Sequence, residues 1–542
     1  MLDNMSPNQR LIVAVVLSVI FFVGYTAIFP PVETETLTPE SSTKINKSTN
    51  VETSHQTLNA VDAEVGHVIS QKDKEADITA ENTILTVTNK NFILKMDTLG
   101  RIASKELLED KFRDANDKHA QIIRSSGAKP LYLRFLDEAL NKEASLTPYT
   151  ASVSQINLEN EAKHVTLTQN LSDLVVTKDI TFYADGHYDI TVSLSKDKRY
   201  FIYVGKRPQV NETEQMMTAK GALVYTDDKQ LTIIEDGDVE GRKTFTGVEL
   251  VAAFDQYTTS MIYGFSKDTS VMIDRDNDDN PVAYFSALQT MKFHGFIGPK
   301  DFKTLHNIKP ILTNVIEYGW FTFASQPMFI VLSWLHGIFG NWGWAIVGLT
   351  ALIRLVLYPL TYKGMMSMQK MKDLAPKLKE LKTKYKKDPQ RLNAATMDMY
   401  KKNGANPLGG CLPMLLQIPV FYAIYRLLLN SVELQGAPWM LWVNDLSRMD
   451  PYYVLPLLMG ASMFLQQRLT PTNFTDPMQE KVMKYLPVIF TFFFVTFPSG
   501  LVLYWFVNNL FSIAQQFIVN QQFQNMKDAQ KALAKNNENK ND

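Results

Sequence analysis

Hydrophobic and polar positions divide the chain into two unlike parts, polar up to about residue 322 and strongly apolar from 325 to 520. In the polar part, Leu85 and Val87 alternate with threonines, and a second alternating run begins at Tyr188. This period of two is typical of strands with one buried face. Asp185-Gly186 lies between two such runs and predicts a tight hairpin. Repetition over about 250 residues predicts a large antiparallel β-sandwich.

The N-terminal segment, 1–29, contains an uninterrupted apolar run from Leu11 to Phe29 that follows Arg10. The run is longer than the apolar part of a usual signal peptide and lacks a small-residue cleavage site. We therefore interpret 1–29 as a transmembrane anchor with its N-terminus in the cytoplasm, rather than as a cleaved signal. Residues 30–62 are rich in Thr, Ser, Glu and Asn, which predicts a flexible tether outside the cytoplasm for the β-sandwich at 63–322.

The apolar part begins with 325–340, which is short, interrupted by Ser and His, and predicts an amphipathic helix at the membrane interface. Residues 341–362 are long enough to span a bilayer and form the second predicted transmembrane helix. The following segment, 363–406, carries twelve Lys or Arg against four Asp or Glu, which places it in the cytoplasm. Helical spacing there, with Asp388-Pro389 as a helix start, predicts a basic helical hairpin.

Residues 407–520 contain four more apolar segments: 408–429, 453–469, 482–497 and 501–519. With the anchor and 341–362 they give six predicted transmembrane helices. An even number of spans puts both termini on the same side, so the tail 521–542 is predicted to lie in the cytoplasm. Several of these segments contain proline, and the carbonyls that proline frees need partners from protein or water.

Arg354 lies inside the second predicted span, where insertion of an arginine costs at least ~2.5 kcal/mol. It could extend its side chain to the cytoplasmic interface. Alternatively, Thr350 one turn earlier makes a polar stripe with it and indicates a hydrated groove. The last span has a polar face of its own, and Gln417 adds an amide in the third. Such faces hold helices together or line a shared cavity; the residues are Asn508, Ser512, Gln515 and Gln516.

Composition excludes several classes of function. A formal net charge of −1 argues against a bulk nucleic-acid binder, and the single cysteine, Cys411, rules out a disulfide within the chain. The histidines lack metal-ligand spacing, and no phosphate loop or nucleophile constellation occurs, so neither an enzyme nor a cofactor is predicted. A secondary transporter or channel that uses Arg354 remains an alternative. An anchored carbohydrate-active enzyme would leave five spans unexplained.

Four long motifs in the apolar part carry a resemblance to a known family. They are NPLGGCLPMLLQIPVF at 406–421, DPYYVLPLLMG at 450–460, TDPMQEKVM at 475–483 and FPSGLVLYW at 497–505. Together they strongly resemble the YidC family of bacterial membrane protein insertases, part of the YidC/Oxa/Alb group, in its Gram-negative form. The resemblance implies six transmembrane helices with a large periplasmic β-supersandwich. It also implies an insertase and chaperone for inner-membrane proteins that works alone or with the Sec translocon.

The resemblance extends to partners and to the site. Newly made inner-membrane proteins, the Sec translocon, membrane lipids and the ribosome are the expected partners, although the tail has only a weak basic excess for ribosome docking. The family's hydrophilic intramembrane groove has a single arginine, which Arg354 matches. The expected groove residues are Arg354, Thr350, Gln417, Tyr504, Trp505, Asn508, Ser512 and Gln515. Four methionines of the cytoplasmic segment are expected to contact varied apolar segments; they are Met365, Met366, Met368 and Met371. Arg426 is expected to reach toward Glu433, outside the groove.

Overall fold

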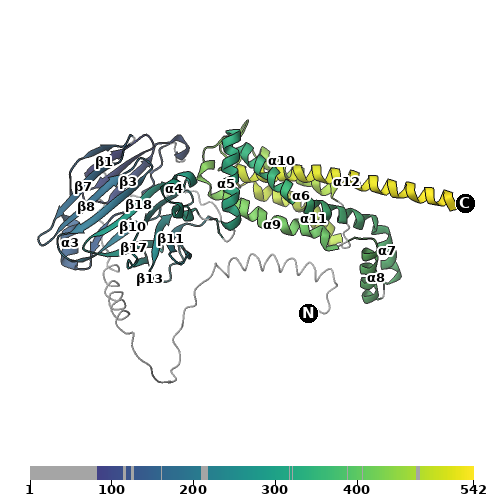
Figure 1. The fold of residues 1–542 in the computed structure, drawn as a ribbon, viewed down its shortest axis with the longest axis horizontal. Helices are drawn as coiled ribbons and strands as arrows, with labels where there is room; N and C mark the ends of the chain where they lie inside the picture. The colour runs from purple at the N-terminus through teal and green to yellow at the C-terminus, as the bar shows by residue number, and fades with distance from the viewer. Residues whose placement is uncertain are drawn as a thin grey trace, which may run out of the picture.

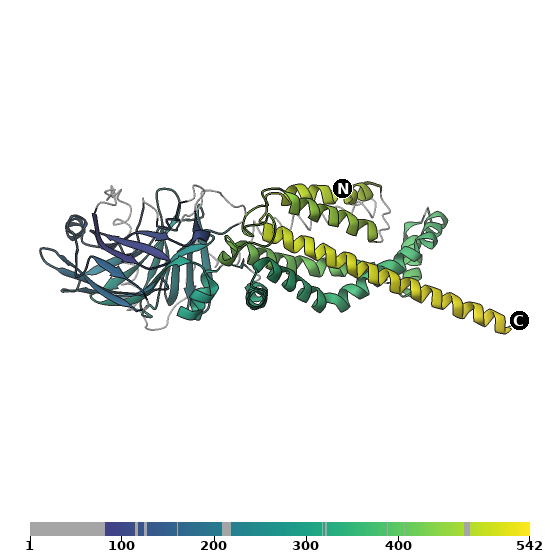
Figure 2. The ribbon, with the colours of Figure 1, turned by 90° about the horizontal axis from the view of Figure 1, so that it is seen from above.

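The computed structural model describes residues 82–541, except for 114–117, 124–126, 160, 209–217, 317, 320–321, 387, 406 and 471–476. The predicted anchor, 1–29, and tether, 30–62, lie outside these described residues. A β-rich domain lies at one end of an elongated molecule and a bundle of helices at the other (Figure 1). The C-terminal helix projects beyond the bundle, as Figure 2 also shows.

The β-rich domain contains three sheets. The largest has nine strands in the order β12-β11-β14-β15-β18-β9-β8-β7-β5, the second has the order β13-β16-β17-β10-β4, and the third β3-β2-β1-β6. The strands are β1 (Thr83–Thr88), β2 (Phe92–Asp97), β3 (Ile102–Leu107), β4 (Leu133–Phe135), β5 (Thr150–Ala151), β6 (Gln155–Asn157), β7 (Lys163–Asn170), β8 (Val175–Phe182), β9 (His187–Leu194), β10 (Arg199–Gly205), β11 (Gly221–Thr226), β12 (Leu231–Glu235), β13 (Lys243–Phe245), β14 (Val248–Phe254), β15 (Thr258–Tyr263), β16 (Val271–Arg275), β17 (Pro281–Leu288) and β18 (Met291–Pro299). One helix, α3 (Glu138–Leu146), lies among them.

The hairpin β8–β9 forms where the sequence predicts it. The two strands pair antiparallel from Val176 opposite Leu194 to Phe182 opposite Tyr188. Buried residues alternate with half-buried ones along β9, so one face of the strand packs into the core. The connecting loop is four residues long, 183–186, and Gly186 has a φ of +94° there. Glycine adopts this left-handed conformation without a Cβ clash. The predicted hairpin with positive φ at its turn is confirmed.

The core between the sheets is apolar but includes buried lysines. Lys178 is 1% exposed and donates hydrogen bonds from Nζ to the carbonyls of Gly100, at 2.8 Å, and Leu131, at 2.9 Å. Burial lowers the pKa of Lys178 to about 7, although the negative charge of Asp97 opposes this shift. Lys105 and Lys300 are buried to the same degree, and burial likewise lowers their pKa values to about 7.

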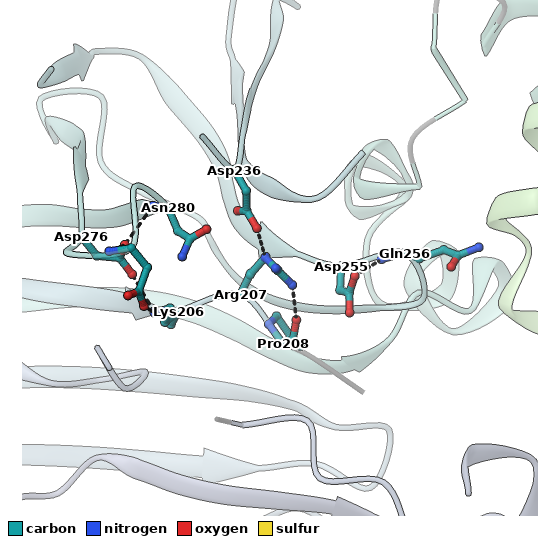
Figure 3. Close-up of polar contacts among 9 residues, drawn as sticks. Lys206, Arg207, Pro208, Asp236, Asp255, Gln256, Asp276 and Asn280 are labelled. Atoms are coloured by element: carbon teal, nitrogen blue, oxygen red, sulfur yellow. Dashed lines mark hydrogen bonds and ion pairs between the residues drawn. The ribbon is translucent and has the colours of Figure 1, made fainter. Parts of the chain in front are cut away.

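Ion pairs hold the turns together at one end of the domain (Figure 3). Lys206, just after β10, pairs with Asp276 at 2.8 Å and with Asp278 at 2.9 Å in the turn between β16 and β17. Arg207 pairs with Asp236 in the turn after β12. These ion pairs tie the end of β10 to the turn between β16 and β17 and to the turn after β12.

The β-rich domain is docked on the helical part through the 3-10 helix η6 (Val432–Leu434). Val432 is 1% exposed and belongs to the domain's own hydrophobic core, although it follows helix α9 of the bundle in the chain. Gln256 Nε2 donates to the carbonyl of Leu429 at 2.8 Å, and the backbone N–H of Phe302 donates to Glu433 Oε1 at 3.0 Å. Burial, reinforced by the charge of Asp301, raises the pKa of Glu433 to about 7. The burial of Val432 and these two hydrogen bonds hold the β-rich domain in a fixed position against the helical part.

Helices α4 and η4 connect the β-rich domain to the bundle, and both pack in one apolar cluster with strands of the nine-stranded sheet and with the bundle. Figure 1 shows α5 crossing the bundle at the end next to the β-rich domain. Among the described residues, two helices are long and apolar enough to cross a membrane, α6 and α12 over Ser499–Leu533. The bounds are α4 (Phe302–Ile308), η4 (Pro310–Val315), α5 (Thr322–Phe339), α6 (Trp342–Asp373), α7 (Ala375–Lys384), α8 (Pro389–Lys402), α9 (Pro407–Asn430), α10 (Val454–Leu469), α11 (Pro477–Phe494) and α12 (Ser499–Asn541).

The basic segment forms a short helical hairpin beyond the bundle (Figure 1). Helix α6 continues through Pro359 to Asp373, so the first ten or so residues of the segment extend that helix. The hairpin itself consists of α7 and α8. The side chain of Asp388 accepts a hydrogen bond from the N–H of Arg391 at 3.1 Å, and Pro389 occupies the first turn of α8. The predicted helix start at Asp388-Pro389 is therefore confirmed.

Candidate functional site

Helix α6 positions Arg354 within an otherwise apolar stretch. The helix is capped by Asn341, whose side chain accepts from the N–H of Trp344 at 3.1 Å. Arg354 is half-buried, whereas the adjacent Leu355 and Val356 are 71% and 72% exposed. Apolar side chains of this exposure fit a lipid-facing surface. The arginine therefore points away from that surface and toward α12.

The guanidinium of Arg354 is held by neutral groups only. Its Nε donates to Asn508 Oδ1 at 2.8 Å, and Nη2 donates to the Asn508 carbonyl at 3.1 Å and to Ser512 Oγ at 2.6 Å. No carboxylate pairs with it in the part of the chain that the structure describes, and no described residue accepts from Nη1. The site thus holds a full positive charge with donors to spare.

Asn508 connects three helices. The same Oδ1 that accepts from Arg354 also accepts from Gln417 Nε2 of α9, at 3.4 Å. Gln417 Nε2 lies 3.2 Å from the hydroxyl of Tyr504, which is 2% exposed. Arg354, Gln417, Asn508, Ser512 and Tyr504 therefore form one hydrogen-bonded group among α6, α9 and α12, which we call the arginine cluster.

Three other expected groove residues lie elsewhere. Thr350 is 1% exposed, and its hydroxyl donates to the Ile346 carbonyl of its own helix at 2.7 Å. Gln515 donates to Thr361 Oγ1 at 2.6 Å, one turn nearer the cytoplasmic end. Trp505 packs edge-on against Phe421, with ring centroids 4.5 Å apart, in an aromatic group with α9 and α11. The structure does not join these three to Arg354 by hydrogen bonds.

Sequence reasoning identified Gln516 but missed several polar residues that it and its neighbours contact. Gln369 of α6 and Gln516 both donate to Asn520 Oδ1, and Asn509 donates to Ser462 of α10 at 3.0 Å. The polar face of α12 thus continues to Asn520, one turn beyond Gln516, and this spacing is visible in the sequence. The partners on α6 and α10 carry no such signal.

The four methionines lie on the last turns of α6 and not on the hairpin. Met366 is buried, and Met365, Met368 and Met371 are half-buried. They therefore sit where α6 leaves the predicted membrane segment, at the base of α7 and α8.

Arg426 does not reach Glu433, contrary to expectation. Glu433 accepts from the Phe302 backbone, and the carboxylate whose charge acts on Arg426 is Glu235 of the β-rich domain. Arg426 is 8% exposed, at the outer end of α9. The β-rich domain thus supplies a carboxylate near Arg426, in place of the expected contact with Glu433.

Comparisons with known proteins identify the family. The family model described as "60Kd inner membrane protein" matches residues 334–527, and the one described as "YidC periplasmic domain" matches 84–331. The "Membrane protein insertase YidC" of Wolinella succinogenes is 46% identical over 523 residues, covering 96% of both chains. The chain belongs to the YidC family.

A second curated relative and one solved structure are also similar to the chain. The "Membrane protein insertase YidC" of Campylobacter jejuni is 44% identical over 523 residues, covering 96% of this chain and 97% of its own. The solved structure titled "Active YidC insertase crystal structure with the first transmembrane domain resolved" matches 84% of this chain and 98% of its own, at 20% identity and a TM-score of 0.36.

Family membership settles the class of function. The chain is a YidC membrane protein insertase of the inner membrane, with a periplasmic domain and without enzymatic chemistry. This decides against the transporter or channel. The β-rich domain, 82–299 as described, corresponds to the periplasmic domain.

Proposed function

We propose that the arginine cluster lines a hydrophilic groove that receives the polar tail of a substrate during insertion. The observation that carries the proposal is the pairing of Arg354 with neutral partners only, with Nη1 left unused. A charge-assisted hydrogen bond to a carboxylate is stronger than one between neutral groups, so an acidic tail would accept from the unused Nη1. Asn508 and Ser512 would hold the guanidinium in place before the tail arrives.

The electrostatic gain has a useful magnitude. Two unit charges 4 Å apart attract by about 1 kcal/mol in water and by about 4 kcal/mol at an effective dielectric of 20. A partly dried groove would therefore stabilise each acidic residue by a few kcal/mol. The apolar segment of the substrate would then move into lipid, with roughly 25 cal/mol for each Å² of apolar surface removed from water. No external energy source is required in this scheme.

Variants at Arg354 test the electrostatic account. Arg354→Ala should impair substrates with acidic translocated tails at least tenfold more than matched substrates with neutral tails, because only the former use the charge. Arg354→Lys should retain activity on both. Arg468→Ala, which removes an exposed arginine that lies over the Phe464 ring of α10, serves as the control. Equal impairment of both substrate sets by Arg354→Ala, at matched protein levels, would refute the account.

We also propose the six-span topology, with both termini in the cytoplasm. The charge imbalance of 363–406 supports a cytoplasmic hairpin. The docking of Val432 supports a periplasmic location for 431–452, because the periplasmic domain surrounds it. Single cysteines in a Cys411→Ser background should react with an impermeant thiol reagent from outside when they lie in the tether, the β-rich domain or 431–452, and not when they lie in 363–406 or 470–480. Labelling of Thr383→Cys in α7 from outside would contradict this topology.

The partners follow from the function. Newly made inner-membrane proteins are the substrates, and we propose that some reach the site from the Sec translocon or directly from the ribosome. The methionines at the end of α6 would contact apolar segments as they arrive, because unbranched thioether side chains adapt to different shapes.

A further inference from the structure

Helices α6 and α12 are joined at four levels by polar contacts. Contacts advance along both helices in the same direction, with sequence separations between 151 and 158, so the two helices run parallel. The levels are Arg354 with Asn508 and Ser512, Thr361 with Gln515, Gln369 with Asn520, and Asp373 with Lys527. The first three follow one another at about two helical turns on α6.

The levels differ in burial. At the first level Arg354 and Asn508 are half-buried, and one guanidinium nitrogen is unused. At the next two levels Thr361, Gln515 and Gln369 are nearly inaccessible, with exposures of 3%, 6% and 8%, and Asn520 is half-buried. The second and third levels therefore resemble the interior of a protein more than the wall of a wet groove. We call these residues the lower seam: Thr361, Gln369, Gln515, Gln516 and Asn520.

Each glutamine of the lower seam donates to an acceptor within it. Gln515 Nε2 donates to Thr361 Oγ1 at 2.6 Å. Gln369 and Gln516 both donate to Asn520 Oδ1, and the second of these bonds is 2.7 Å long. Separating α6 from α12 here would strand buried amides without water or protein partners, which is strongly unfavourable. The contact between the two helices is thus least able to open where the lower seam lies.

We propose that the lower seam is a permanent clamp that stays closed throughout insertion. Its residues are positioning residues: they hold the cytoplasmic extension of α6 against α12 and so fix the position of the hairpin α7–α8 relative to the arginine cluster. Gln515 belongs to this clamp rather than to the substrate-lining surface. The inference rests on the proposed role of the arginine cluster, because the clamp fixes where that site and the hairpin lie.

Cross-linking tests whether the seam must open. In a Cys411→Ser background, a bifunctional thiol reagent joins the cysteines of Thr361→Cys and Gln515→Cys. The reagent is short enough to link them only while α6 and α12 are in contact. Insertion of a model substrate should stay within twofold of that of the untreated protein. A tenfold or greater loss on cross-linking, with both single-cysteine variants unaffected by the reagent, would overturn the proposal.

A second measurement tests positioning. Spin labels at Thr383→Cys on α7 and Asn525→Cys on α12 report the hairpin's place, since both positions are exposed. Asn520→Leu removes the shared acceptor and should at least double the width of the distance distribution. Exchange of the amides, Gln369→Asn with Asn520→Gln, should restore the narrow distribution. Gln524→Leu, an exposed amide one turn further on, is the control.

The two proposals can fail separately. An unchanged distribution in Asn520→Leu would refute the clamp whatever the result at Arg354. Conversely, Arg354→Ala should leave the distribution as in the parent protein, so a failed electrostatic account would not affect this readout.

Discussion

Glu433 should make the docking of the periplasmic domain depend on pH. Its carboxyl accepts from the Phe302 N–H inside the interface, and burial with the nearby charge of Asp301 raises its pKa to about 7, against an opposing charge on Lys111. An undocked Glu433 would titrate near the ordinary value of 4.5. The docked state therefore binds more protons between pH 4.5 and 7. Docking is strongest below pH 4.5 and weakens as the pH rises through about 7.

The size of the effect follows from the two pKa values. At 1.36 kcal/mol for each pKa unit, the difference between 4.5 and about 7 corresponds to about 3 kcal/mol. This is roughly a hundredfold change in the docking equilibrium or somewhat more. Glu433→Gln cannot ionise and keeps an oxygen that can accept from Phe302. Its docking should be independent of pH and, above pH 7, tighter than in the parent protein.

Hydrogen exchange of the Phe302 amide measures this docking directly. Protection, corrected for the intrinsic exchange rate, should fall by up to about a hundredfold from pH 4.5 to 8 in the parent protein. In Glu433→Gln it should stay level. The N–H of Leu455, bonded to Asp450 within the helical part at 2.7 Å, controls for general loosening. Identical profiles in the two proteins, or protection that rises with pH in the parent, would refute the reasoning.

Three further predictions concern stability. Gly343→Ala should destabilise the contact of α6 with the loop 431–452 by about 1–3 kcal/mol in thermal unfolding, because its Cβ would lie 2.2 Å from the Trp439 ring; a neutral result would mean that the ring moves freely. Asp388→Ala should cost about 1 kcal/mol of α8 stability, seen as faster exchange of the Arg391 amide, whereas Asp388→Asn should not. The unfolding free energy should rise from pH 7 to 10, because the buried Lys105, Lys178 and Lys300 bind fewer protons in the folded state than in the unfolded state there. Lys178→Met removes one of these three lysines and should therefore remove about a third of the slope.

Local features could be predicted because neighbouring residues determine them. Period-two alternation identified β8 and β9, and Asp388-Pro389 marked the start of α8, since a strand face and a helix cap depend only on residues close in the chain. The i, i+4 spacing of Asn508 and Ser512 identified the polar face of α12. The spacing did not show which helix this face meets; the structure shows that Asn508 and Ser512 accept hydrogen bonds from Arg354 of α6.

Partners distant in the chain were harder to predict. Thr350 and Gln515 share a face with the arginine cluster in sequence, yet one bonds to its own helix and the other to Thr361, because helix packing decides which polar side chains meet. The division of the sandwich into three sheets depends on pairings between remote strands. Val432 reads as one apolar residue in a loop, and only the docked fold shows that it fills the core of another domain.

Burial of Val432 in the core of the periplasmic domain couples that domain, through helix α9, to the arginine cluster. Helix α9 runs from Gln417 in the arginine cluster to Asn430 near Val432, about 20 Å at 1.5 Å for each residue. If α9 tilted by about 5° about its end at Asn430, Gln417 would be displaced sideways by about 2 Å, which is more than a hydrogen bond tolerates. The bonds of Gln417 to Tyr504 and Asn508, at 3.2 and 3.4 Å, would be the first to break. A rotation of the periplasmic domain would thereby change the hydrogen bonds of Asn508, which also accepts from Arg354, the one charged side chain of the cluster.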